Sequence, residues 1–206
     1  MKVRMFVFVL ISALFVSGAA FAADEAAPAD APAQDKAAAD KAAMMEKMKA
    51  ASTPGAEHKV LEILAGRWTA ASKFWMDPNA PAEESTGTAA TEMVFGGRFL
   101  KETYKGTAHG EPFEGVGYTG YDNVKKQYVG NWVDSMATGI MNSTGEYDAA
   151  SKTLKTGDTM SCPINGEAKM RMENVITDND HHTLTGYMTG ADGKESKGME
   201  IVYTRA

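Results

Sequence analysis

Cysteine is almost absent from this sequence, with one residue, Cys162, in 206. A single cysteine cannot form a disulfide within the chain, so the fold must be stable without one. Long hydrophobic runs are absent as well. The longest apolar stretch, residues 5–16, is shorter than the roughly 20 residues that a helix needs to cross a bilayer. The sequence therefore predicts no membrane span.

Positive charge is also in short supply, with 21 lysine and arginine residues against 27 aspartate and glutamate residues and a formal net charge of −6. No cluster of lysine or arginine stands out along the chain. Nucleic acids and anionic membrane surfaces are bound through such basic clusters. The charge balance therefore argues against both partners, and it makes no prediction about the oligomeric state.

Residues 1–22 have the order of a secretory signal peptide. Lys2 and Arg4 precede the apolar run, and Ala20-Phe21-Ala22 provides an A-x-A cleavage site. We expect cleavage after Ala22 and export of the protein to the periplasm or out of the cell. No cysteine follows the cleavage site directly, so a lipid anchor is not expected.

Residues 23–53 are rich in alanine and contain no aromatic side chain. A segment with so little to bury is typical of a tether that is disordered or partly helical, and residues 35–50 contain strong helix formers. Met44, Met45 and Met48 raise the idea of a soft-metal site, since thioethers bind Cu(I). An apolar edge on a marginal helix is the preferred interpretation.

From residue 54 onward, short alternating runs separated by glycine, aspartate and asparagine indicate an all-β domain. A short amphipathic helix comes first, with Val60, Leu61 and Leu64 on one side. Ten strands follow, near residues 67–76, 86–95, 98–107, 113–121, 127–136, 139–147, 152–160, 166–177, 181–189 and 195–204.

No connection between these strands is long enough for the crossover helix that parallel strands require. Closing an antiparallel meander on itself removes its exposed edges. The sequence therefore predicts one domain over residues 54–206. Its fold is an antiparallel up-and-down β-barrel of about ten strands with a short N-terminal helix and an interior that can hold a small ligand.

The hairpin of residues 113–136 has a register that follows from its turn at 122–126. The expected cross-strand pairs are Tyr121 with Tyr128, Gly117 with Trp132, and Gly115 with Asp134. The indole would then lie over bare glycine backbone and stabilise a curved sheet. A second hairpin is expected to turn through a two-residue loop, Gly96-Gly97, which pairs Val94 with Phe99.

Gly66-Arg67-Trp68, a G-x-W sequence at the start of the first strand, resembles the opening of lipocalin-type (calycin) barrels. In that superfamily the tryptophan packs at the closed end of the barrel against an arginine near the last strand. Arg205 is the matching arginine here. The resemblance implies a structural clasp between Trp68 and Arg205, in which a guanidinium lies over an indole.

Longer segments resemble, in order and spacing, a family of exported bacterial proteins known as domain of unknown function 1579. The segments are PGAEHKVLEILAGRWTA, ESTGTAATEMVFGGRFLKETYKG, PFEGVGYTGYDNVKKQYVGNWVDSMATGIM and KGMEIVYTR. The resemblance covers residues 54–206. It implies a lipocalin-like barrel and no established activity.

Asp134 is the main polar candidate because it shares its expected strand face with Trp132. A carboxylate inside a barrel must be satisfied by donors or serve a ligand. A structural role, such as capping the turn that follows Asp134, is the alternative and stays open. Trp132, Asp134, Tyr118 and Tyr104 are predicted to line a ligand-binding interior.

His109 lies in a loop at the expected mouth of the barrel and is a further ligand-binding candidate. Some haem-binding barrels related to lipocalins use one histidine ligand, so His109 and His182 are the residues that would hold haem. His181 and His182 point to opposite strand faces and cannot share one ion. Apart from this haem alternative, no cofactor and no metal site are predicted.

The function that we expect is the binding of a small, mostly apolar molecule inside the barrel. One alternative is a small-substrate enzyme with Asp134 or His109 as general acid or base, although no Ser-His-Asp set and no catalytic residue can be assigned. The others are a haem-binding barrel and a structural envelope-stress protein with a filled interior. Met170 and Met172, which alternate on one strand, fit core packing better than contact with a ligand.

Overall fold

The computed structural model describes residues 31–162, 166–190 and 193–206. The signal peptide expected at 1–22 and the first part of the expected tether lie outside this description, so export stays a prediction. The chain divides into two compact units, residues 1–43 and 44–206. Helix α1 (Ala31–Ser52) contains the 35–50 segment. Within the described ranges, no helix is long and apolar enough to cross a membrane.

The second unit contains the end of α1, the short helix α2 (Ala56–Glu62) and ten strands. The strands are β1 (Gly66–Phe74), β2 (Glu83–Val94), β3 (Phe99–Ala108), β4 (Glu111–Asp122), β5 (Gln127–Asp134), β6 (Met141–Asp148), β7 (Thr153–Cys162), β8 (Gly166–Ile176), β9 (His181–Thr189) and β10 (Glu195–Arg205).

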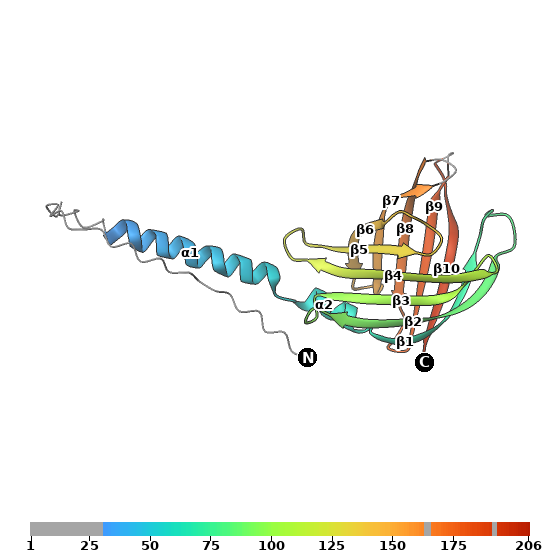
Figure 1. Cartoon of the computed structure of the whole chain (residues 1–206), viewed down its shortest axis with the longest axis horizontal. Helices are drawn as coiled ribbons and strands as arrows, with labels where there is room; N and C mark the ends of the chain where they lie inside the picture. The colour runs from blue at the N-terminus through green and yellow to red at the C-terminus, as the bar shows by residue number, and fades with distance from the viewer. Residues whose placement is uncertain (1–30, 163–165, 191–192) are drawn as a thin grey trace, which may run out of the picture. The chain divides into compact units, whose positions relative to one another are not determined.

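All ten strands form one closed barrel in the order β1-β10-β9-β8-β7-β6-β5-β4-β3-β2, and each pairs antiparallel with its neighbours. The predicted up-and-down barrel is therefore confirmed. β1 and β10 close it through seven residue pairs that run from Trp68 with Arg205 to Phe74 with Met199. Figure 1 shows β2 to β5 running across the direction of β8 to β10.

The register predicted for β4 and β5 is also confirmed, with Tyr121 opposite Tyr128, Gly117 opposite Trp132 and Gly115 opposite Asp134. The Trp132 ring lies directly on both glycines, because a Cβ at either position would clash with ring atoms. Glycine at 115 and 117 thus lets an indole pack flat on the backbone of a bent strand.

The hairpin between β2 and β3 has the predicted Val94 to Phe99 pair, but the prediction of a two-residue loop is wrong. The connection has four residues, 95–98, because Phe95 leaves the strand with φ of 52° and continues into Gly96 and Gly97 at 67° and 84°. The Phe95 ring packs edge-on against Phe99, with ring centroids 6.4 Å apart. That contact offers a physical reason for the longer loop.

Two hydrophobic clusters form the core. The first consists of Leu61, Leu64, Leu100, Tyr128, Leu154 and Ile176. The second consists of Trp68, Ala70, Ala89, Tyr104, Ile201 and Tyr203. Helix α2 contacts β2, β3 and β4, and the Tyr128 hydroxyl donates to the carbonyl of Glu57 at 2.8 Å. We call this end of the barrel the α2 end, and the opposite end, where β1 connects to β2, the far end.

Candidate functional site

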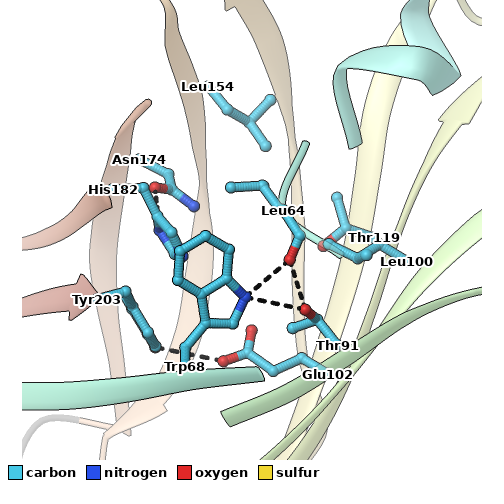
Figure 2. Close-up of a pocket in the computed structure, with 10 residues that line it drawn as sticks. All are labelled: Leu64, Trp68, Thr91, Leu100, Glu102, Thr119, Leu154, Asn174, His182 and Tyr203. Carbon is cyan, nitrogen blue, oxygen red and sulfur yellow. Dashed lines mark hydrogen bonds between the residues drawn. The ribbon is translucent and has the colours of Figure 1, made fainter. Parts of the chain in front are cut away.

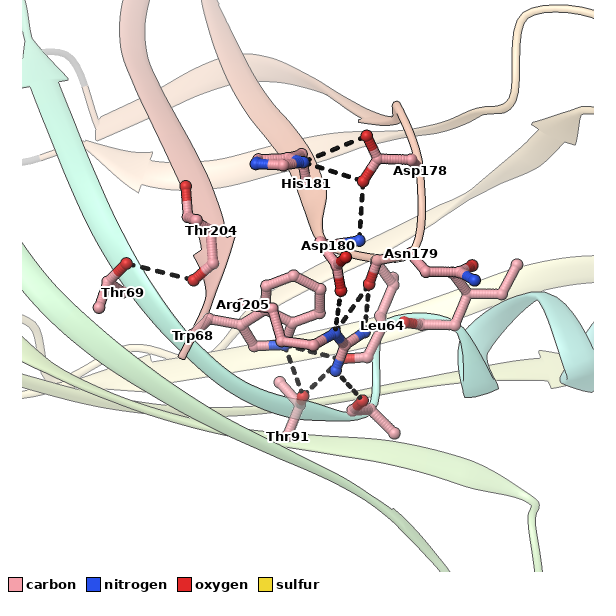
Figure 3. Close-up of polar contacts among 12 residues, drawn as sticks. Leu64, Trp68, Thr69, Thr91, Asp178, Asn179, Asp180, His181, Thr204 and Arg205 are labelled. Atoms are coloured by element: carbon pink, nitrogen blue, oxygen red, sulfur yellow. Dashed lines mark hydrogen bonds and ion pairs between the residues drawn. The ribbon is translucent and has the colours of Figure 1, made fainter.

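The clasp at the α2 end begins with Trp68, which is 1% exposed. Its indole N–H donates to the Leu64 carbonyl at 3.0 Å and to the Thr91 hydroxyl at 3.2 Å. Leu64 follows α2 directly, and Thr91 lies on β2 opposite Gly66. The bond to Leu64 therefore ties the segment after α2 to the start of the barrel (Figure 3).

Arg205 completes the clasp that the resemblance implies, with its guanidinium carbon 4.1 Å from the Trp68 ring centroid. The same guanidinium donates to the carbonyls of Ile63 and Ala65 at 3.1 and 3.0 Å. A Cβ on Gly66 would clash with it, and Gly66 has a φ of 150°. The glycine of the G-x-W sequence is therefore required for the cation to reach the indole. Figure 3 shows Arg205 beside the Trp68 ring.

A cavity of about 50 Å³ lies beside the clasp (Figure 2). Its lining residues are Leu64, Trp68, Thr91, Leu100, Glu102, Thr119, Leu154, Asn174, His182 and Tyr203. This volume is enough for a few water molecules and far below the roughly 300–1,000 Å³ of typical sites for drug-sized ligands.

Glu102 is the carboxylate of this cavity, and sequence analysis missed it. The Tyr203 hydroxyl donates to it at 3.3 Å. Burial raises the pKa of Glu102, and the bond from Tyr203 opposes part of that rise. Burial beside this carboxylate also holds the pKa of Tyr203 well above its usual value. Alternation along β3 was the available signal, since Glu102 shares its face with buried Leu100 and Tyr104.

His182 is 6% exposed and lies between two rings. It stacks on Tyr203 with centroids 4.3 Å apart and meets the edge of Trp68 at 4.6 Å. Burial, helped by the charge of Arg205, lowers the pKa of His182 to about 4, so the imidazole is neutral at physiological pH. Its Nδ1 lies 3.0 Å from the amide oxygen of Asn174. An oxygen accepts there, so Nδ1 carries the proton.

His109 lies apart from this cavity. It occupies the turn between β3 and β4 with φ of 53°, and its side chain is 41% exposed. Its Nδ1 lies 2.7 Å from a carboxylate oxygen of Glu83. The position is that of a surface hydrogen bond at the far end of the barrel.

Trp132 and Asp134 lie on the inner face in the far half, and Trp132 packs against the second hydrophobic cluster. The indole N–H of Trp132 donates to one carboxylate oxygen of Asp134 at 3.0 Å. The other oxygen accepts the amides of Met136 and Ala137 at 2.9 and 3.1 Å. Asp134 thus caps the turn after β5, and it also fixes the orientation of the Trp132 ring.

Tyr104 and Tyr118 have opposite placements. Tyr104 is buried on the inner face, and its hydroxyl lies 3.2 Å from that of Ser72. Tyr118 pairs with Lys101 on one side and Asn131 on the other, which puts it on the outer face. The structure therefore brings Trp132, Asp134 and Tyr104 into the interior and leaves Tyr118 outside.

The far half of the inner face is lined by large apolar side chains that are only half-buried. They are Phe74, Phe113, Trp132, Met141, Met160, Met170, Met172, Met188 and Met199. The α2 half differs, because Leu61, Trp68 and Tyr128 are at most 2% exposed. The interior is thus tightly filled at one end and incompletely covered at the other.

A larger concavity of about 450 Å³ lies on the surface, open to solvent, where β5 to β8 neighbour one another. Two cations line it, and both are engaged: Lys155 with Asp148, and Arg171 with Glu173 and Glu195. The bonds to Glu195 raise the pKa of Arg171 far above its usual range. In the residues that the structure describes, no group of three or more His, Cys, Asp and Glu side chains gathers to hold a metal ion.

Two solved structures illustrate the fold. Rv2717c from M. tuberculosis has a TM-score of 0.53 and 15% identity, over 75% of this chain and 99% of that chain. The S-type phycobiliprotein lyase CPES from Guillardia theta has a TM-score of 0.50 and 11% identity, over 74% of this chain and 98% of that chain. At such low identity the likeness establishes the fold alone.

No curated protein is significantly similar to the chain in sequence. A family described as "Protein of unknown function (DUF1579)" matches residues 53–205. This range contains α2 and all ten strands, and it nearly coincides with the domain predicted at 54–206. The chain therefore belongs to the DUF1579 family.

Proposed function

We propose that this protein binds a small, mostly apolar molecule in the far half of the barrel interior. The observation that carries the proposal is the incomplete burial of the aromatic and methionine side chains on that part of the inner face. Protein interiors are normally close-packed. A ligand that covers this surface gains about 25 cal/mol for each Å² removed from water.

The lining suits such a ligand in two ways. The Trp132 ring is fixed by the bond to Asp134 and by the glycine backbone beneath it, so it offers a rigid apolar wall. The methionines provide flexible, polarizable contacts that adapt to ligand shape. A rigid wall facing an adaptable one is typical of apolar ligand sites with a few placed polar groups.

The filled-interior alternative accounts for the α2 half only. There the aromatic rings and leucines pack until a cavity of about 50 Å³ is left. The enzyme alternative has less support. The oxygens of Asp134 already accept three hydrogen bonds. The Nδ1 of His109 already lies within hydrogen-bond distance of a carboxylate oxygen of Glu83.

Titration with a neutral, environment-sensitive naphthalene dye tests the proposal. We expect saturable binding of one dye per chain with quenching of tryptophan fluorescence. Met141→Lys places a charge on the inner face opposite Trp132 and should weaken binding at least tenfold. Asn142→Lys places the same charge one residue away on the exposed outer face and should leave binding unchanged.

Two results would contradict the proposal. One is the absence of saturable dye binding to the folded wild-type protein. The other is an equal loss of binding in Met141→Lys and Asn142→Lys, because the dye would then not occupy the inner face.

A further inference from the structure

Four methionines from three adjacent strands form one patch on the inner face of the far half. Met170 on β8 pairs directly with Met188 on β9. In the next row, Gly186 on β9 pairs with Met172 on one side and Met199 on the other. The patch is therefore two rows of methionine with a bare glycine in the middle.

Two of the four side chains, those of Met172 and Met199, turn toward that glycine. The sulfur of Met172 lies 3.1 Å from the position that a Cβ on Gly186 would occupy, and the terminal methyl of Met199 lies 3.4 Å from the same point. Met188 lies 3.1 Å from the corresponding point on Gly198, where β10 has a bulge. Two glycines on adjacent strands thus provide space for three methionine side chains, with Met172 and Met199 at Gly186 and Met188 at Gly198.

These four side chains are half-buried, which sets them apart from a finished core. Apolar packing alone would favour a β-branched or aromatic residue at strand positions. Thioether sulfur is a soft ligand that selects soft metal ions such as Cu(I). Asp158, which pairs with Met170, is the carboxylate nearest in register and is too hard a ligand to compete for such an ion.

We propose that Met170, Met172, Met188 and Met199 form a thioether site for a soft monovalent cation, Cu(I) or Ag(I). Strand pairing puts these four thioethers at neighbouring positions of β8, β9 and β10, and two or three sulfurs would supply the low coordination number that such ions accept. The site does not depend on the proposed apolar ligand. Either can exist without the other, although both use the far half of the barrel.

Ag(I) is the probe, because it is stable in air and binds the same soft ligands. The experiment uses chloride-free buffer and the Cys162→Ser background, which removes the one thiol in the chain. Calorimetry should show one tightly bound ion per chain, and X-ray absorption at the silver edge should show sulfur as the bound neighbour. The variant with all four methionines changed to leucine should bind at least tenfold more weakly.

Leucine is a volume-conserving replacement that usually costs less than about 1.5 kcal/mol per site, and circular dichroism reports whether the variant is folded. A matched control changes Met44, Met45 and Met48 to leucine, since these methionines on α1 are 55–59% exposed. The control should bind Ag(I) as the Cys162→Ser protein does.

No Ag(I) binding in the Cys162→Ser protein, or equal binding in its folded four-leucine variant, overturns the site. The same holds if the control loses binding and the four-leucine variant keeps it. The neutral dye separates the two proposals. Dye binding retained by the four-leucine variant leaves the apolar site intact whichever way the silver experiment turns out.

Discussion

Glu102 and His182 line one cavity, and burial favours the neutral form of both. Their effects on stability have opposite signs. The neutral form of His182 becomes protonated as pH falls, whereas the neutral form of Glu102 becomes deprotonated as pH rises. The free energy of unfolding therefore contains two opposing contributions in the mildly acidic range.

For Glu102, the folded state holds the carboxyl proton more tightly than the unfolded state, whose pKa is about 4.5. The free energy of unfolding therefore falls as pH rises above that value. Glu102→Gln keeps the acceptor for Tyr203 and removes the titration. We expect the variant to be more stable than wild type at pH 8 and nearly equal to it at pH 4, measured by urea unfolding.

Glu92→Gln is the matched control, because Glu92 lies on the outer face of the adjacent strand beside Lys101. A stability difference between Glu102→Gln and wild type that does not change with pH would rule out titration of Glu102.

For His182, the folded pKa of about 4 lies below the unfolded value of 6.5. The unfolded state binds the proton first, so the free energy of unfolding falls as pH drops through this window and recovers as pH rises. The effect is on the order of 3 kcal/mol, since each pKa unit is worth about 1.4 kcal/mol. His182→Phe should remove this slope and lower stability at pH 7 by about 1–3 kcal/mol, because Asn174 loses its partner.

His181→Phe provides the comparison, since His181 is the exposed neighbour bound to Asp178. If this variant, and not His182→Phe, flattened the stability profile between pH 4 and 6.5, the slope would not come from His182.

At the scale of elements, the β4 and β5 hairpin is the curved wall of the proposed site. Its bend depends on two positions without a Cβ beneath one indole. The ring cannot move freely, because its N–H is bonded to Asp134. A side chain at either glycine must displace the ring or the strand.

Gly115→Ala should therefore destabilise the barrel by about 1–3 kcal/mol, the usual cost of overpacking. In the Trp132→Ala background the same substitution should cost much less, because the ring is gone. Chemical unfolding of the four proteins in this double-mutant cycle gives the coupling energy. A coupling energy near zero would show that the indole does not pack on Gly115.

Some of this site was predictable from residue order and some was not. Pairing around the turn at 122–126 predicts that Gly117 faces Trp132, and the same parity puts Tyr118 on the opposite face, so the register itself argues against Tyr118 as a lining residue. Glu102 lies two residues from Tyr104 on the same strand, so the alternation of side chains puts it on the inner face as well. The φ of Phe95 was not predictable, because a positive φ is rare at phenylalanine and residue order does not indicate that its ring packs on Phe99.

The division of the interior into a filled half and an incompletely covered half could not be predicted either. Both halves have aromatic and aliphatic side chains in alternation. The difference arises because α2 supplies Leu61, and the segment after α2 supplies Leu64, to one end. The alternation of apolar residues along the strands does not indicate which end of the barrel the helix covers.

For the molecule as a whole, closure of the barrel depends on the pairing of β1 with β10, and Arg205 joins that seam to the segment after α2. Arg205→Lys keeps the charge but loses the planar fork that reaches several carbonyls at once. We expect a loss of roughly 1–3 kcal/mol in the free energy of unfolding. Arg67→Lys, on the exposed face of β1, should change it by less than about 0.5 kcal/mol.

Equal stability of Arg205→Lys and Arg67→Lys in thermal unfolding would show that the contacts of the guanidinium add nothing to closure. The cation over Trp68 would then be sufficient with either side chain.

Photolabelling with a neutral aliphatic diazirine, followed by peptide mass spectrometry, maps where an apolar molecule lies in the protein and so tests binding in the far half of the barrel. We expect saturable labelling of inner-face residues in the far half, foremost Trp132, Met141 and Met172, and we expect an unlabelled aliphatic alcohol to compete with it. Labelling confined to the outer face or to the α2 end would contradict it.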